Sequence, residues 1–302
     1  MRVAVTGASG RLGRAFVDAL GDAPFTGPAG PIAWTRADFD LDAPATIGEL
    51  LDRDRPEVVI NAAAWTDVDG CARDPELALR RNAKAVRVLA EATAARDVDL
   101  VQISTNEVFD GRRAHDRGYR PDDRAAPANP YGASKLAGEE AAAAAYRGSG
   151  ANLGIVRTSW LFGPPGNDFP TKILAAAAAA GVDRQSLKVV GDEFGSPTFT
   201  HDVAEAVAAM LGADVPRGVR HVVNAGVASR ADWARELFRQ AGIDVAIEQL
   251  SMSDWPRAST PPAWGVLEPT ASPGVEPLRP WQQALADYLP VLRRQRTATA
   301  AR

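Results

Sequence analysis

The sequence predicts an α/β fold in which a Rossmann-like, doubly wound parallel sheet is joined to a smaller C-terminal α/β domain. Two observations carry this prediction. Short segments rich in valine and isoleucine alternate with alanine-rich segments through the first half of the 302 residues, as in repeated βαβ units. A glycine-rich turn also follows the first valine-rich segment, where such folds bring main-chain N–H groups together.

The expected elements alternate one by one, so that each strand is followed by a crossover helix. The strands are expected at 3–5, 33–35, 58–61, 100–104 and 154–158, and the helices near 11–20, 45–53, 75–96 and 131–147. Beyond Trp160 the alternation weakens, because Gly163-Pro164-Pro165-Gly166 interrupts it and prolines recur from 256 to 280.

These breaks define the expected domains. Residues 1–162 form the Rossmann domain, which a strand near 219–227 rejoins, since His221 to Ala225 has the composition of a strand. Residues 163–290 form the smaller domain, and residues 291–302 are expected to be a flexible tail.

Composition excludes several classes of function. A net charge of -4 disfavours a nucleic-acid surface. The single cysteine, Cys71, excludes an internal disulfide, and His115, His201 and His221 are too scattered for a metal site. The apolar run at 173–180 is too short to cross a membrane, and the chain opens on a strand without an export leader. We therefore expect a cytoplasmic protein without a metal, and keep a homodimer open.

The glycine-rich turn is typical of a dinucleotide site. Gly7, Gly10 and Gly13 are spaced G-x-x-G-x-x-G, between the first strand and the first helix. Glycines there allow a tight turn whose N–H groups bind a pyrophosphate at the helix N-terminus. Arg36, at the end of the second strand, favours the 2′-phosphate of NADPH, although the nearby Asp38 and Asp40 leave NADH open.

A tyrosine and a lysine four residues apart indicate proton transfer. Tyr131 and Lys135 lie on one face of an expected helix, where the ammonium would lower the pKa of the phenol. The strand before this helix ends in Ser104 and Thr105, at the edge of the sheet where ligands bind. We expect Thr105, Tyr131 and Lys135 to be catalytic, with Tyr131 donating the proton.

Further motifs follow the same order as in a known family. They are Asn61-Ala62-Ala63-Ala64-Trp65-Thr66-Asp67-Val68-Asp69-Gly70, Asn82-Ala83, Ser104-Thr105, Val108-Phe109-Asp110-Gly111, Asn129-Pro130-Tyr131-Gly132, Ser134-Lys135-Leu136, Gly138-Glu139, Arg157-Thr158-Ser159-Trp160 and Gly195-Ser196-Pro197-Thr198. With the glycine turn, they resemble the dTDP-4-dehydrorhamnose reductase family of the extended short-chain dehydrogenases/reductases. The resemblance extends to about Trp281.

The resemblance implies a role for each matching position. The pyrophosphate would be held by Gly7, Gly10, Arg11, Leu12 and Gly13, the adenine flanked by Asp40 and Leu41, and the cofactor cleft lined by Ala62, Ala63 and Ala64. Thr105 and Tyr131 would bind the sugar carbonyl and Lys135 the nicotinamide ribose. The sugar would be bordered by Val68, Asp69, Asn106 and Trp160, with Arg257 and the Trp264-Gly265-x-Leu267 stretch contributing from the smaller domain.

One departure affects the substrate. The family reads Ser-Thr-Asp-Tyr-Val-Phe, whereas this chain has Asn106 in place of the acid and Glu107 in place of the aromatic ring. Thr105, Tyr131 and Lys135 are intact, so reduction should be retained. The nucleotide base and the 4-keto sugar stay open.

The expected reaction is NADPH-dependent reduction of the 4-keto group of a nucleotide-activated 6-deoxy sugar, with dTDP-4-dehydro-L-rhamnose giving dTDP-L-rhamnose. Two alternatives remain. An epimerase or dehydratase would retain NAD and need an added acid/base, which Glu107 could supply. A catalytically silent regulatory subunit would be expected to lose the Tyr131 and Lys135 pair, which this chain keeps.

Overall fold

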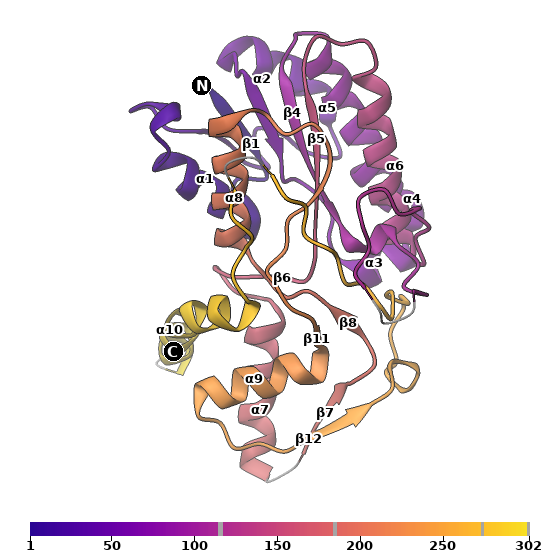
Figure 1. The fold of residues 1–302 in the computed structure, drawn as a ribbon, viewed down its shortest axis with the longest axis vertical. Helices are drawn as coiled ribbons and strands as arrows, with labels where there is room; N and C mark the ends of the chain where they lie inside the picture. The colour runs from indigo at the N-terminus through magenta and orange to yellow at the C-terminus, as the bar shows by residue number, and fades with distance from the viewer. Residues whose placement is uncertain (114–116, 184–185, 273–274, 301–302) are drawn as a thin grey trace.

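The computed structural model describes residues 1–113, 117–183, 186–272 and 275–300, which form two lobes stacked along the longest axis (Figure 1). His115 lies outside these residues. Within the described ranges no group of three or more His, Cys, Asp or Glu is arranged to hold a metal ion. No helix in them has the length and apolar character needed to cross a membrane.

A six-stranded parallel sheet forms the centre of the first lobe. In spatial order its strands are β2 (Ile32–Trp34), β1 (Val3–Thr6), β3 (Val58–Asn61), β4 (Asp99–Thr105), β5 (Leu153–Thr158) and β10 (Gly218–His221). The predicted α/β class is confirmed, and the order reverses between β1 and β3. Such a switch point opens a crevice at the carboxyl ends of the strands.

Helices cover both faces of this sheet, because successive strand residues are apolar on both sides. Val3 and Val5 face α1 (Arg11–Gly21) and α8 (Thr200–Ala213), whereas Ala4 faces α2 (Ile47–Asp54), α5 (Ala85–Ala94) and α6 (Pro130–Ala145). Continuous apolar strands of this kind are typical of a buried parallel sheet.

The helix predicted at 75–96 is divided into three parts. A π-helical turn, Arg80–Lys84, separates α4 (Pro75–Leu79) from α5. It contains the buried Asn82, which accepts a hydrogen bond from the main-chain N–H of Trp65 at 2.8 Å and donates to Ser134 at 3.0 Å. The turn thus links α6 to the segment after β3, as π-turns at functional sites often do.

The second lobe packs three helices around an aromatic core. They are α7 (Phe169–Asp183), α9 (Arg230–Ala241) and α10 (Trp281–Ala300), with Phe162, Trp233 and Tyr288 buried between them. Short strands pair as β6 (Leu161–Phe162) with β9 (Thr198–Phe199), β7 (Leu187–Val190) with β12 (Ile247–Leu250), and β8 (Phe194–Gly195) with β11 (Ala228–Ser229). The short helix α3 (Val68–Arg73) packs against α6 in the first lobe.

The chain passes between the lobes more often than the domain prediction implies. Helix α8 packs on α1, and β10 pairs with β5, so residues 200–221 lie in the first lobe. Strand β10 ends at His221, short of the end of the strand predicted near 219–227, because Asn224 leaves the sheet to donate to Asp202 at 2.6 Å. At the C-terminus α10 continues to Ala300 instead of giving way to a tail at 291, and residues 301–302 lie outside the described part.

Candidate active site

Two adjoining cavities occupy the carboxyl edge of the sheet. The first is lined by Gly7, Ser9, Gly10, Arg36, Phe39, Asp40, Leu41, Ala62, Ala63, Ala64, Trp65 and Arg81. The second, of about 370 Å³, is lined by Gly10, Arg11, Leu12, Gly13, Ala62, Ala64, Thr66, Val68, Ile103, Ser104, Thr105, Asn106, Glu107, Tyr131, Lys135, Thr158, Ser159, Trp160, Leu161 and Arg230. Since both include Gly10, Ala62 and Ala64, they form one continuous groove.

The glycine turn has the geometry of an anion site. Gly7 has a positive φ of 63°, and a Cβ atom on Gly13 would lie 2.1 Å from the carbonyl oxygen of Gly7. The N-cap residue of α1 is Gly10, which has no side chain to accept hydrogen bonds from the first N–H groups of the helix. Those N–H groups are therefore available to a ligand. The residues present therefore fit a pyrophosphate group.

Arg11 and Leu12 contribute side chains to other contacts. The Arg11 guanidinium donates to the carbonyl oxygens of Gly166 at 2.8 Å and Leu161 at 3.4 Å, which ties α1 to the second lobe. Leu12 belongs to the core beneath the sheet, where it is 8% exposed. Any pyrophosphate contact of these two residues would come from their main-chain N–H groups.

Charged side chains surround the far end of the first cavity. Arg36 is exposed and lies 3.5 Å from Asp40 and 3.8 Å from Asp42. Arg81, which the sequence analysis missed, binds Asp42 with two hydrogen bonds of 2.6 and 2.8 Å. Those bonds hold the pKa of Asp42 below its ordinary value. Arg81 comes from the π-turn, so no spacing in the sequence connects it with Arg36.

Tyr131 and Lys135 both line the second cavity, but the acidity of Tyr131 differs from the prediction. The Lys135 ammonium donates to the carbonyl oxygen of Ile103 at 2.7 Å, and burial lowers its pKa to about 8. Burial and the charge of Glu107 raise the pKa of Tyr131, although a hydrogen bond with Thr105 acts in the opposite direction. The expectation that Lys135 keeps this phenol acidic is therefore wrong for the protein in this structure.

The end of β4 places Thr105 and Asn106 in the same cavity. The Thr105 hydroxyl donates to Asn106 Oδ1 at 3.3 Å and accepts from the main-chain N–H of Glu107 at 3.2 Å. The Asn106 amide donates to the carbonyl oxygen of Gly265 at 3.0 Å. A Cβ atom on Gly265 would lie 2.4 Å from that amide, so a glycine is needed for the two segments to meet.

Trp160 and Arg230 form the opposite wall. Trp160 stacks on Trp233 at 5.8 Å, and the Arg230 guanidinium lies 3.5 Å from the centre of the Trp160 ring. Arg230 also donates to the buried Glu193 at 2.8 Å. Sequence reasoning missed Arg230, because its position depends on how α9 packs in the second lobe.

The remaining predicted sugar contacts divide into two groups. Val68 lines the second cavity. Asp69 and Arg257 instead bind each other at 3.3 Å, and Asp69 also accepts from the main-chain N–H of Ser259 at 3.0 Å. Neither Asp69 nor Arg257 is among the described residues that line the two cavities. Their ion pair instead joins α3 to the 257–259 segment beside the site.

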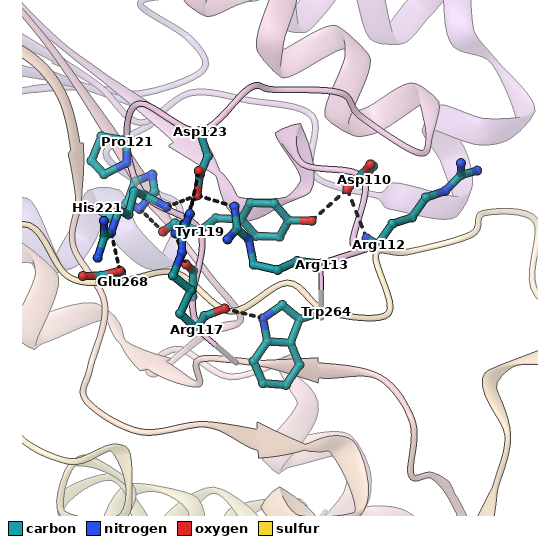
Figure 2. A network of polar contacts seen from close by, with 12 residues as sticks. Asp110, Arg112, Arg113, Arg117, Tyr119, Pro121, Asp123, His221, Trp264 and Glu268 are labelled. Atoms are coloured by element: carbon teal, nitrogen blue, oxygen red, sulfur yellow. Dashed lines mark hydrogen bonds and ion pairs between the residues drawn. The ribbon is translucent and has the colours of Figure 1, made fainter. Parts of the chain in front are cut away.

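A polar network around Tyr119 connects the 110–123 segment with His221, Trp264 and Glu268 (Figure 2). The Tyr119 hydroxyl donates to Asp110 at 2.7 Å, and its ring stacks on Phe109 at 4.2 Å. Trp264 donates to the carbonyl oxygen of Arg117 at 2.9 Å and belongs to one apolar cluster with Val108, Phe109 and Tyr119. Trp264 thus holds the segment that follows Asn106 and Glu107.

Comparison with known proteins identifies the family. The sequence matches the RmlD substrate binding domain model over residues 1–294. It is 37% identical over 290 residues to the dTDP-4-dehydrorhamnose reductase of Mycolicibacterium smegmatis, covering 95% of this chain and 84% of that protein. The chain belongs to the dTDP-4-dehydrorhamnose reductase family. The resemblance inferred from the motifs is confirmed.

Solved structures of the family have the same fold. A dTDP-4-dehydrorhamnose reductase from Clostridium acetobutylicum matches with a TM-score of 0.86 at 32% identity, covering 97% of this chain and 100% of that chain. The reductase from Bacillus anthracis, in complex with NADP, matches with a TM-score of 0.83 at 30% identity, covering 95% of this chain and 98% of that chain.

Proposed function

We propose that the protein is an NADPH-dependent reductase of the 4-keto group of a nucleotide-activated 6-deoxy sugar, with dTDP-4-dehydro-L-rhamnose as substrate and dTDP-L-rhamnose as product. The observation that carries the proposal is the shared cavity of Thr105, Tyr131 and Lys135, which is continuous with the glycine turn. The names of the related reductases support the same reaction.

The first cavity would hold the adenosine half of the cofactor. Main-chain N–H groups of the glycine turn would bind its pyrophosphate, Asp40 and Leu41 would flank the adenine, and the segment 62–64 would line the cleft. Arg36 would bind a 2′-phosphate, which favours NADPH over NADH. The NADP bound to the Bacillus anthracis relative supports this preference.

The second cavity would hold the sugar, bordered by Val68, Asn106 and Trp160. When bound, the cofactor supplies the reducing equivalent. The hydroxyl groups of Thr105 and Tyr131 would bind the sugar carbonyl oxygen and stabilise the negative charge that develops there. Because the pKa of Tyr131 is raised, its phenol stays protonated at neutral pH and can donate its proton to that oxygen. Lys135 would orient the nicotinamide ribose.

Replacement of Tyr131 by phenylalanine tests the proposal. We expect Tyr131→Phe to lower kcat for NADPH oxidation with dTDP-4-keto-6-deoxy sugars by roughly 10²- to 10⁴-fold, because the proton donor is lost. Tyr146→Phe is the matched control. Its hydroxyl bonds Thr93 and the carbonyl oxygen of Val98 at the far end of α6, so activity should persist. A Tyr131→Phe enzyme with the parental rate would refute the assignment.

Product analysis separates the reductase from the alternatives. Substrates of both C5 configurations should show which sugar is reduced, with one NADPH consumed per product. NAD that copurifies with the protein, without net consumption of NADPH, would indicate an epimerase or dehydratase instead.

The proposal also covers partners and location. The substrate partner would be a nucleotide sugar, the location would be the cytoplasm, and the oligomer to be tested is a homodimer. Cell fractionation and sedimentation of the purified protein would measure these two properties directly.

A further inference from the structure

Glu107 lies in the second cavity on a short 3₁₀ turn, Asn106–Val108, that follows β4. Its main-chain N–H donates to the Thr105 hydroxyl at 3.2 Å. Its carbonyl oxygen packs against the start of α6, where a Cβ atom on Gly132 would come within 1.9 Å of it. The backbone of Glu107 is therefore fixed relative to both hydroxyl groups that are proposed to bind the ketone.

The side chain of Glu107 is fixed as well. The Asn129 amide donates to Glu107 Oε2 at 2.6 Å and to the carbonyl oxygen of Thr260 at 3.1 Å. The Oδ1 atom of the same asparagine accepts from the Gly132 N–H at 2.9 Å, which caps α6. One residue thus holds the carboxyl group and the helix that carries Tyr131. The bond from Asn129 engages Oε2 and leaves Oε1 outside it.

The surroundings of Glu107 favour hydrogen bonding over ion pairing. Burial raises the pKa of this carboxyl group, and the nearby Glu193 acts in the same direction. The hydrogen bond from Asn129 lowers the pKa, and so do Arg257 and Arg230. Both arginines are bound to other carboxylates, Asp69 and Glu193. The Oε1 atom of this carboxyl group can accept a hydrogen bond from a sugar hydroxyl.

The chemistry of the proposed substrate indicates which group would meet this carboxyl. In a 4-keto-6-deoxy sugar, one carbon beside the ketone, C3, carries a hydroxyl, and the other, C5, carries a methyl group. The carboxyl group of Glu107 lines the same cavity as Thr105 and Tyr131, and its charge acts on Tyr131. With the ketone oxygen at Thr105 and Tyr131, this carboxyl would face the neighbouring carbons. The C3 hydroxyl can form a hydrogen bond with it, whereas the methyl group cannot.

We propose that Glu107 is a specificity-determining residue whose carboxyl group binds the C3 hydroxyl of the 4-keto sugar. The inference rests on the proposed reductase function and deepens it. Glu107 stands where the family carries an aromatic ring, so it would set the substrate preference of this chain apart from that of its relatives. A site built to bind a hydroxyl also discriminates against substrates that lack it.

A cycle of two enzymes and two substrates tests this inference. The kcat/KM of the parental protein and of Glu107→Ala is measured with the 4-keto-6-deoxy sugar nucleotide and with its 3-deoxy analogue. We expect the parental enzyme to prefer the 3-hydroxy substrate by roughly 10- to 100-fold, as for one hydrogen bond to a half-buried carboxyl group. The Glu107→Ala variant should prefer the 3-hydroxy substrate by no more than about threefold, because the substitution and the missing sugar hydroxyl each remove the same hydrogen bond. Equal preference in the two enzymes would overturn the assignment.

Three further variants guard against indirect effects. Glu107→Met fills the same space without a carboxyl group and should behave like Glu107→Ala. Agreement between the two variants shows that the result does not arise from a folding defect caused by the smaller alanine. Glu107→Gln can still accept from Asn129 and should restore part of the preference. Glu140→Gln, on the exposed face of α6, is the matched control and should keep the parental preference.

The cycle distinguishes failure of the inference from failure of the proposed function. No NADPH oxidation by the parental enzyme with either sugar would overturn the reductase function, and the role of Glu107 with it. Turnover of both sugars with preferences independent of residue 107 would overturn only the role of Glu107.

Discussion

The buried ion pair between Glu139 and Arg157 provides a demanding test of how α6 is attached to the sheet. Arg157 on β5 donates to the carboxylate of Glu139 at 2.6 and 3.0 Å, and the two residues are 5% and 4% exposed. Its guanidinium also lies over the ring of Phe109, at 5.2 Å from the centre. Replacement of Glu139 by leucine would leave the Arg157 charge buried without its partner.

We expect Glu139→Leu to lower the free energy of unfolding by about 3–5 kcal/mol. For a chain of 302 residues this corresponds to about 5–8 °C in Tm. The double variant Glu139→Leu/Arg157→Met should lose less than either single variant, since no unpaired charge remains. Urea unfolding followed by tryptophan fluorescence and circular dichroism measures all three variants. A double variant whose loss equals the sum of the single losses would refute the reasoning.

The same replacement should change the pH profile. Burial lowers the pKa of Lys135 to about 8, and the carboxylate of Glu139 opposes this shift. Without Glu139 the pKa of Lys135 falls below about 8, so the ammonium is lost at a lower pH. If that ammonium holds the ribose, the fall in kcat/KM for NADPH at alkaline pH should begin earlier in Glu139→Leu. If the alkaline fall in kcat/KM for NADPH occurred at the same pH in both enzymes, the Lys135 ammonium would not be required for cofactor binding.

Three other predictions concern the cofactor and acid stability. Gly13→Ala should weaken NADP binding in titration calorimetry at least tenfold, because its Cβ would lie 2.1 Å from the Gly7 carbonyl oxygen. Arg36→Ser should reduce the preference for NADPH over NADH in steady-state kinetics by roughly 10- to 100-fold if Arg36 binds the 2′-phosphate. Burial lowers the pKa of His221 from 6.5 to about 4, so the unfolded chain binds more protons between these values and stability falls as the pH drops through them. His221→Asn should remove about 3 kcal/mol of this loss, measured as urea unfolding at pH 4 and pH 7.

The fold was predictable because the signals that encode it are local. The apolar pattern of β1 and its neighbours, with alanine-rich crossovers between them, specifies a parallel sheet without knowledge of distant contacts. The glycine turn is likewise contained within residues 7–13, and Tyr131 and Lys135 lie within about one turn of α6. Their positions in one groove follow from the topology.

The unpredicted features depend on contacts between distant segments. The pKa of Tyr131 is set by burial and by Glu107, not by its helical neighbour, since the Lys135 ammonium reaches Ile103. Arg230 reaches the groove through the packing of α9, and Asp69 meets Arg257 across 188 positions of the chain. No spacing within one segment encodes such pairs.

The repeated passage of the chain between the lobes determines which fragments could be produced as stable recombinant proteins. A truncation after residue 162 would leave β5 as an open edge and uncover the apolar side of α1, because β10 and α8 would be missing. Such a fragment is expected to aggregate. An exchange of the second lobe between relatives would therefore require two or more segments to be replaced, with residues 200–221 of the first lobe retained from the parent protein.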